Sequence, residues 1–237
     1  MSEILDQAKV GIQNWNIARN DSPITIPVFN SGSFFKITSS NYSTWKNSLN
    51  TSGYKEEDQN IHAYLSLDQP TKEGQLSLYA VDNYTDSLPV IGHEPAYTQN
   101  LQFLSYEPAN LYNVYFNKET FDMSGIDPLH ALEQSTQWTL HKDLWLDNQN
   151  NMTQILVIPF GDIKVLFEQT NADFLVAQPA FSLKGEEGAY ILEMDLIIWG
   201  YSNYNGIIGK YPRDLIQPVP PYSGYSAAAF QLLQYSI

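Results

Sequence analysis

Two carboxylates, Glu193 and Asp195, lie two residues apart in a segment from Tyr190 to Trp199 that is otherwise rich in aliphatic residues. In a β-strand, residues i and i+2 point to the same face and lie about 7 Å apart. Carboxyl groups at about this separation can act as nucleophile and acid in glycoside hydrolysis. The pattern therefore indicates one candidate catalytic pair, Glu193 and Asp195.

The segment also resembles the first half of a Glu-x-Asp-x-x-Glu run that one glycoside hydrolase family carries on a strand. The resemblance covers only Glu193 and Asp195, because Ile198 stands at the position of the final acid. The proton donor that the resemblance would imply is therefore absent. The competing interpretation, which we favour, is an amphipathic strand whose even-numbered residues from Leu192 to Ile198 face the core while both acids face water.

A stretch rich in aromatic residues offers a second candidate site. The runs Trp199–Gly206 and Tyr222–Tyr225 set Trp and Tyr among Gly, Ser and Asn. This composition is typical of binding loops, because Tyr offers a large contact area at low entropic cost and Asn offers adaptable hydrogen bonds. Alternatively, the rings fill the seam between two halves of the chain and their hydroxyls reach water. The candidate binding residues are Trp199, Tyr201, Asn203, Tyr204, Tyr222 and Tyr225.

Other chemistries have little support in the sequence. His130 and His141 are separated by about 16 Å if one helix carries both, so they cannot share an ion, and we expect surface histidines. His62 and His93 have no Ser-x-Gly elbow nearby, which argues against a hydrolase triad. The Gly185–Gly188 run is acidic and so unsuited to phosphate. The chain has no cysteine, which removes thiolate nucleophiles and Cys-ligated metals. We predict no metal site and no cofactor.

Charge and composition narrow the class of protein further. The 237 residues include 12 Lys and Arg against 26 Asp and Glu, and the formal charge of -14 disfavours binding to nucleic acid or anionic lipid. No stretch approaches the roughly 20 apolar residues of a transmembrane helix. The first residues, Met1–Asp6, have neither the basic nor the apolar part of a secretion signal. We therefore expect a cytoplasmic protein that contacts neither nucleic acid nor membrane.

The two halves of the chain share an order of elements: a helix carrying a tryptophan, a strand and a hairpin. The matched segments are Ala8–Trp15, Ile24–Phe29 and Lys72–Gly74 in the first half, and Ala131–Trp138, Val157–Phe160 and Glu186–Gly188 in the second. Such a match predicts internal duplication. We expect an α+β fold of two related units, residues 1–122 and residues 123–237, the second with a Pro- and Tyr-rich tail. Each unit would place its helix on a mainly antiparallel sheet.

Local patterns predict the remaining elements. The expected strands are Phe34–Thr38, Ile61–Leu67, Gln75–Val81, Leu101–Tyr106, Ile155–Phe160, Ile163–Phe167, Phe174–Leu183 and Tyr190–Trp199. We expect three further helices: one that is capped by Ser39 or Ser40 and ended by Gly53, one that starts after an Asp127 cap, and one that spans Ser226–Tyr235. The length of the helix after Asp127 stays open, because the apolar residues from Trp138 to Leu146 also alternate as in a strand.

These patterns favour a non-catalytic binding or assembly module, since no nucleophile motif, metal constellation or phosphate loop is found. A protein partner or self-association is expected before a small ligand. The alternative is a carbohydrate-binding protein or glycoside hydrolase that uses Glu193, Asp195 and the loop from Trp199 to Tyr204.

Overall fold

Helices and strands are mixed along the chain, which confirms the predicted α+β class. The computed structural model describes residues 3–88, 98–105, 126–149, 152–184, 191–202, 206–213 and 217–219, together with residues 230 and 232. The helices are α1 (Glu3–Ala18), α2 (Ser22–Asn30), α3 (Ser39–Ser52), the 3-10 turn η1 (Glu56–Asp58), α4 (Asn83–Ser87), α5 (Pro128–Asp147) and α6 (Phe160–Thr170). The strands are β1 (Phe34–Thr38), β2 (Asn60–Leu67), β3 (Leu76–Asp82), β4 (Gln99–Leu104), β5 (Ile155–Pro159), β6 (Phe174–Lys184), β7 (Ile191–Ser202), β8 (Gly206–Arg213) and β9 (Gln217–Val219).

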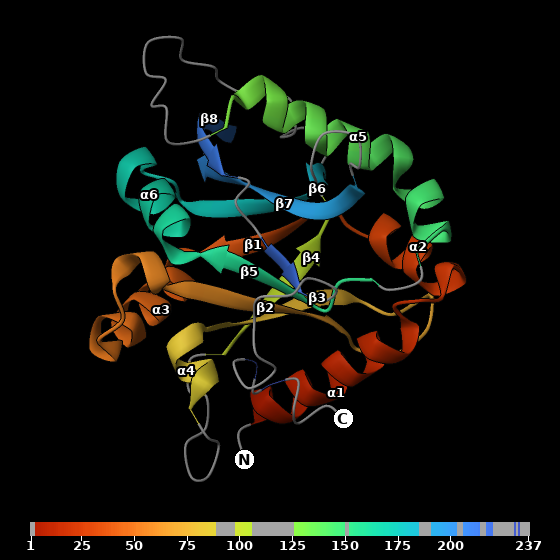
Figure 1. Ribbon diagram of the computed structural model, residues 1–237, viewed down its shortest axis with the longest axis horizontal. Coiled ribbons are helices and arrows are strands. Elements are labelled where there is room, and N and C mark those ends of the chain that lie inside the picture. Colours follow the sequence, from red (N-terminus) through yellow and green to blue (C-terminus); the bar gives the residue numbers. More distant parts are fainter. Residues whose placement is uncertain are drawn as a thin grey trace.

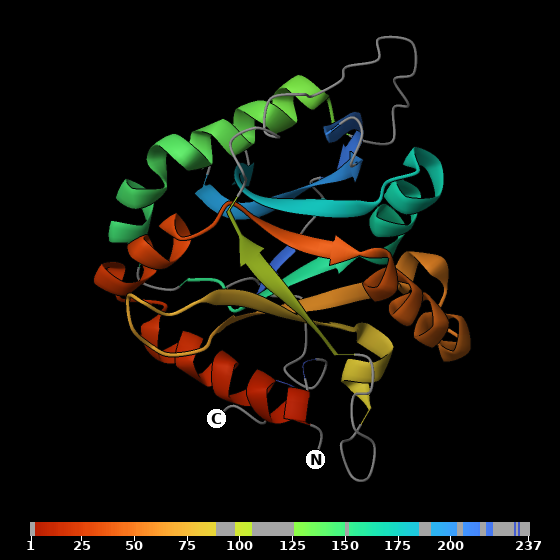
Figure 2. The same cartoon turned by 180° about the vertical axis from the view of Figure 1, so that it is seen from behind.

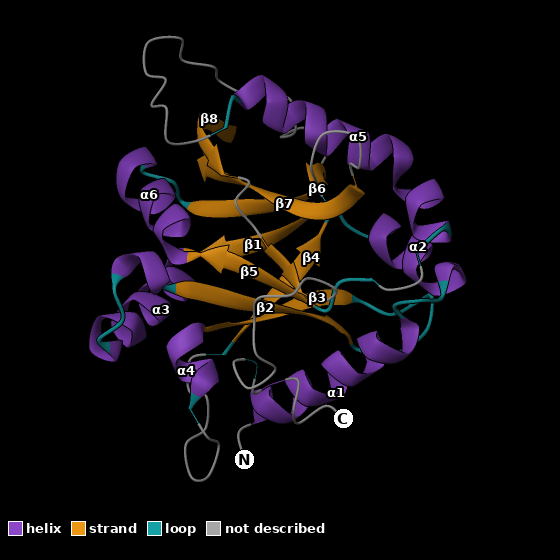
Figure 3. Ribbon diagram, viewed as in Figure 1, coloured by secondary structure: helices purple, strands orange, loops and turns teal. Residues whose placement is uncertain are grey.

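One curled sheet organises these elements. Its strands pair in the order β8-β7-β6-β1-β4-β3-β2-β5-β9, and each neighbouring pair is antiparallel. The sheet curls far enough for β9 to contact β7. Helices lie around the outside and at the two ends of the curl, with α3 and α6 on one side and α2 and α5 on the other (Figure 1, Figure 3).

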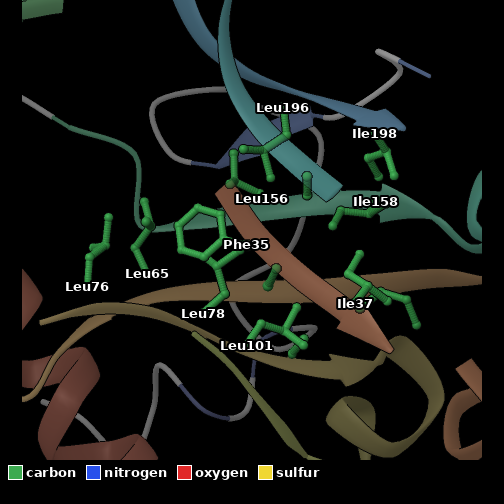
Figure 4. Packing of buried hydrophobic residues seen from close by; sticks show 14 of the residues in the cluster. Phe35, Ile37, Leu65, Leu76, Leu78, Leu101, Leu156, Ile158, Leu196 and Ile198 are labelled. Atoms are coloured by element: carbon green, nitrogen blue, oxygen red, sulfur yellow. The ribbon is translucent and has the colours of Figure 1, made fainter. Parts of the chain in front are cut away.

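The main hydrophobic core fills the inside of the curl. Side chains from strands on opposite sides meet there, as Phe35 of β1, Leu65 of β2, Leu156 of β5 and Leu196 of β7 do in Figure 4. Two smaller clusters lie on the outer surfaces of the sheet. One packs residues of α1 against β2, β3 and β5, and the other includes Ala131 of α5 with residues of β1, β6 and β7.

The predicted strand over Ile24–Phe29 is wrong, because these residues belong to α2. Thr25, Val28 and Phe29 are the buried residues of this helix, and their spacing of three and four follows one helical face. Pro23 lies in the first turn, where a missing N–H removes no helical hydrogen bond. The aliphatic residues of this short run fit the period of a strand as well as that of a helix. Packing against the core stabilises the helix.

The predicted strand over Ile163–Phe167 is also wrong, because it lies within α6. Ile163 and Leu166 are buried together with Phe160, at the i, i+3, i+6 spacing of a helix. The strand predicted just before it is confirmed as β5, and both predicted hairpins are confirmed as β2–β3 and β6–β7.

The helix after Asp127 runs without interruption to Asp147, which settles its length. The Asp127 carboxylate caps it by accepting a hydrogen bond from the Leu129 backbone N–H at 2.7 Å, as predicted, and Pro128 takes the first turn. At 20 residues α5 is the longest described helix. Neither α5 nor another helix in the described ranges is long and apolar enough to cross a membrane.

Helix α3 begins one residue earlier than predicted. Its cap is Thr38, whose side chain accepts a hydrogen bond from the Asn41 backbone N–H at 3.2 Å, and the Asn41 side chain in turn accepts one from the Thr38 backbone N–H at 2.7 Å. Two reciprocal bonds of this kind form a capping box. The predicted end at Gly53 is confirmed, and its φ of 76° explains why glycine stands there.

The sheet joins strands from both sides of the predicted boundary between residues 122 and 123. β1 pairs with β6, and β5 pairs with β2. The boundary lies outside the described residues, as does almost all of the predicted helix Ser226–Tyr235. The division into two units stays a prediction.

Candidate functional site

Glu193 and Asp195 point to the outer face of β7, but they do not face water. Their exposed fractions are 5% and 1%, whereas Leu192, predicted to face the core, is 38% exposed. The acids lie opposite Ser182 and Ala180 of β6, on a face that the third hydrophobic cluster also covers. The prediction of two solvated acids is therefore wrong, because the sheet is covered on both faces.

The two acids differ in their surroundings. Asp195 Oδ1 accepts a hydrogen bond from the Leu196 backbone N–H at 2.7 Å. Glu193 Oε1 is buried and accepts no hydrogen bond from the described residues. Neither acid lines the groove described below. The carbohydrate-active alternative that relies on them stays a prediction.

Trp199 and Tyr201 are strand residues of β7, so the predicted loop is wrong at these positions. Their exposed fractions are 2% and 9%, and both belong to a cluster with Phe34 of β1. Phe174 stacks on Tyr201 with ring centroids 4.4 Å apart. Residues from both halves thus meet around these rings, and a binding role for them stays a prediction. Asn203, Tyr204, Tyr222 and Tyr225 lie outside the described residues.

His62 and Asp86 form a buried pair between β2 and α4, which the sequence did not reveal. His62 Nδ1 lies 2.6 Å from Asp86 Oδ2, and the Tyr64 hydroxyl donates to the same oxygen. The Leu232 backbone N–H donates to Asp86 Oδ1 at 3.3 Å. Burial, reinforced by the Asp86 carboxylate, raises the pKa of Tyr64 well above its ordinary value. The phenol therefore keeps its proton and acts as a donor.

In the described part of the chain, the His62–Asp86 pair acts as a structural anchor. The Phe230 ring lies 4.7 Å from the His62 ring, so the C-terminal residues pack on the pair as well as bonding to it. Within the described ranges, no serine or threonine hydroxyl makes a hydrogen bond to His62, as a nucleophile would. The one sequence signal for the cluster is that His62 and Tyr64 share a face of β2.

Two other histidines, His130 and His141, are surface residues as predicted, and His93 lies outside the described residues. His130 and His141 are both exposed on α5, and His130 Nδ1 lies 3.7 Å from Glu133 Oε2. The described part of the chain contains no group of three or more His, Asp or Glu side chains placed to hold a metal ion.

Helix α5 carries apolar residues on two opposite faces. One face packs on the protein through Ala131, Trp138 and Leu146. The opposite face exposes four leucines: Leu129 at 67%, Leu132 at 44%, Leu140 at 67% and Leu144 at 69%. At about 100° per residue, these four leucines fall within an arc of about 120°. The alternation between Trp138 and Leu146 that suggested a strand comes from these two faces.

The exposed leucine face of α5 is also acidic. Glu133, Asp143 and Asp147 are exposed in the same arc. Asp147 Oδ1 accepts a hydrogen bond from the Ser22 hydroxyl at 2.8 Å, and Asp143 lies 4.0 Å from Lys142 Nζ. The Lys142 side chain is only 14% exposed, so the charge that α5 presents to solvent beside the leucines is negative.

A groove of about 550 Å³ runs between α1 and the outer face of β3 and β4. In Figure 2, β4 crosses the front of the sheet and α1 lies beside it. Seven Ser, Asn and Gln residues line the groove, including Ser77, Asn100 and Gln102, and the sole charged residue among the described lining is Asp68. Sequence patterns did not reveal this groove, because its residues come from one helix and three strands.

No protein-family model, curated protein or solved structure matches this chain. The function is therefore argued from the geometry of the molecule. Two features present side chains to solvent in an arrangement suited to binding: the acidic leucine face of α5 and the polar groove beside α1.

Proposed function

We propose that this chain is a non-catalytic binding or assembly module that docks a protein partner on the outer face of α5. The observation that carries the proposal is the row Leu129, Leu132, Leu140 and Leu144, exposed on a helix whose other face already packs on the protein. Exposed apolar side chains gathered on one face of a folded protein commonly mark an interaction surface. The proposed place of action is the cytoplasm.

The apolar area indicates how strong such docking can be. Between 44% and 69% of each leucine is exposed, and burying this surface contributes about 1 kcal/mol per leucine. Four leucines together contribute about 4 kcal/mol, at the lower end of the roughly 4–15 kcal/mol that association costs. Apolar contact alone therefore gives a weak complex, so the partner must add favourable contacts of another kind.

Charge indicates what those contacts are. The leucines lie among Glu133, Asp143 and Asp147, and the whole chain carries a formal charge of -14. A second copy docking here would bring like charges together, whereas a basic segment would be attracted. The proposed occupant is therefore an amphipathic helix of another protein, with apolar residues along one face and Lys or Arg beside them.

A synthetic peptide tests this proposal. The probe is a helix of about 18 residues, roughly 27 Å long, with leucines on one face and lysines elsewhere. We expect it to bind the wild-type protein, with an affinity that falls as salt rises because the attraction is screened. Replacing its lysines by glutamates should abolish binding.

Paired variants locate the surface. Leu140→Gln with Leu144→Gln removes two apolar contacts and should weaken binding about 30-fold, the equivalent of about 2 kcal/mol. The matched control is Val10→Gln with Ile17→Gln, because these α1 residues are 54% and 66% exposed and lie elsewhere. Equal binding by both variants, preference for the glutamate peptide, or a stable homodimer that requires the α5 leucines would overturn the proposal.

We also infer that the two halves descend from one duplicated unit. The order strand, helix, hairpin occurs as β1-α3-β2-β3 and again as β5-α6-β6-β7. When β1 is matched to β5 and β2 to β6, the observed pairing of β1 with β6 corresponds to the observed pairing of β5 with β2. This correspondence replaces the one drawn from sequence, since Ile24–Phe29 is helical, and it matches α3 with α6.

Similar features of the two halves support the same inference. Trp15 of α1 and Trp138 of α5 both pack edge-on against Phe29, with ring centroids 6.1 and 5.3 Å away. Both α3 and α6 end at a left-handed residue, Gly53 with φ 76° and Asn171 with φ 53°. An experimental structure tests the inference: residues 34–82 should superpose on residues 155–202 with their elements in the same order.

A further inference from the structure

The groove beside α1 has a floor of ordered polar side chains. Ser66 of β2, Ser77 of β3 and Gln102 of β4 lie in register across three neighbouring strands. In the next row on this face, Tyr79 lies opposite Asn100, whose Nδ2 donates to the Tyr79 hydroxyl at 3.3 Å. Hydroxyl and amide groups therefore cover an outer sheet surface where a packed face would carry apolar residues.

Ser66 marks the edge of this floor at which α1 covers the sheet. The residue is only 1% exposed, because α1 packs on it. Its nearest neighbour from above is Gly11 of α1, where a Cβ would lie 2.0 Å from Ser66 Oγ. Glycine thus lets α1 pack directly on Ser66 and form one wall of the groove, and the accessible part of the floor consists of Ser77, Asn100 and Gln102.

The residues that line the groove indicate which class of ligand it can bind. Serine hydroxyls and glutamine or asparagine amides can both donate and accept hydrogen bonds, which matches the hydroxyl groups of a sugar. The described lining has no Lys or Arg, and its one charged group, Asp68, would repel an anion. The half-buried Phe103 adds aromatic surface at the groove, against which the apolar face of a sugar ring can pack. A volume of about 550 Å³ is within the range of small-molecule sites.

We propose that this groove binds a neutral, polyhydroxylated ligand, namely a saccharide of one or two rings. The site is separate from the α5 face and uses neither Glu193 nor the residues near Trp199. It holds its ligand through Ser77, Asn100 and Gln102 on the floor, with the Tyr79 hydroxyl beside Asn100. No chemical step is assigned to it.

Calorimetry with a panel of neutral mono- and disaccharides tests this proposal. The panel contains glucose, mannose, galactose, N-acetylglucosamine, maltose and cellobiose, with glucose 6-phosphate and glucuronate as charged counterparts. We expect at least one neutral sugar to bind, and the charged sugars to bind at least tenfold more weakly. Ser77→Val with Gln102→Ala should weaken binding at least tenfold, whereas Gln13→Ala, an exposed residue of α1 outside the groove lining, should not.

A second measurement does not depend on the variants folding. Backbone NMR shifts of the wild-type protein should change at Ser77, Asn100 and Gln102 when the bound sugar is added. Failure of every neutral sugar to bind at tens of millimolar would overturn the proposal. So would tighter binding of the charged sugars, or shift changes confined to other parts of the protein. None of these results bears on peptide docking at α5.

Discussion

The His62 imidazole and the Asp86 carboxylate lie 2.6 Å apart in the interior, with exposed fractions of 4% and 2%. Twenty-four residues separate them in sequence, and β2 and α4 bring them together. Asp86 also accepts hydrogen bonds from Tyr64 and from the Leu232 backbone N–H. One carboxylate thus connects a central strand, a short helix and the C-terminal part of the chain.

Removing this carboxylate should therefore destabilise the protein strongly. Asp86→Ala leaves His62, Tyr64 and the Leu232 N–H without their common acceptor, and we expect a loss of about 3–5 kcal/mol in the free energy of unfolding. Urea denaturation measures this, and faster hydrogen exchange at the Leu232 amide should accompany it. The control Asp58→Ala, at an exposed position, should change stability by about 0.5 kcal/mol or less. Equal effects of the two substitutions would contradict the anchoring role.

Asp82 makes stability depend on pH in a defined direction. Burial raises the pKa of the Asp82 carboxyl above its ordinary value, although hydrogen bonds from the Thr85 backbone N–H and hydroxyl partly oppose this. The folded state therefore holds this proton to higher pH than the unfolded state does. The stability that Asp82 contributes is fully present below the ordinary carboxyl pKa and is lost as pH rises through the raised one.

Asp82→Asn should remove this dependence while keeping an oxygen to cap α4. The measurement is the urea midpoint of both proteins between about pH 3 and pH 7. We expect the variant to gain stability relative to wild type as pH rises through this window. A difference between the two proteins that stays constant with pH, or that moves the other way, would be inconsistent with a raised pKa at Asp82.

Glu193 should reduce stability, since its Oε1 is buried without a hydrogen bond from the described residues. Replacing it by an apolar side chain of similar length removes the cost of desolvating that oxygen. We expect Glu193→Met to raise the free energy of unfolding by about 1–3 kcal/mol. The control Glu57→Met, where the side chain is 73% exposed, should leave stability nearly unchanged. A large loss in Glu193→Met would instead indicate that the carboxylate has an essential partner.

The elements that sequence patterns predicted correctly are those with a strong local signal. The hairpin of β2 and β3 is one such element, and the helix that starts at Asp127 and Pro128 is another. The two wrong strands, Ile24–Phe29 and Ile163–Phe167, are short apolar runs, for which helical and strand periods cannot be told apart without knowing what they pack on.

The candidate sites depend on contacts that a sequence does not display. Glu193 and Asp195 alternate with apolar residues as exposed acids would, and only the covering of both sheet faces buries them. The groove floor needs three strands in register. The leucine face of α5 could have been predicted from the sequence, because plotting its residues at helical angles separates Leu140 and Leu144 from Trp138.

The docking surface is the central claim, and leucine-methyl NMR with the leucine–lysine peptide tests it most directly. We predict that the methyl signals of Leu129, Leu132, Leu140 and Leu144 shift on titration, and that those of core leucines such as Leu65 and Leu156 do not. Unchanged signals from all four α5 leucines at saturating peptide, or shifts confined to residues elsewhere, would contradict the account.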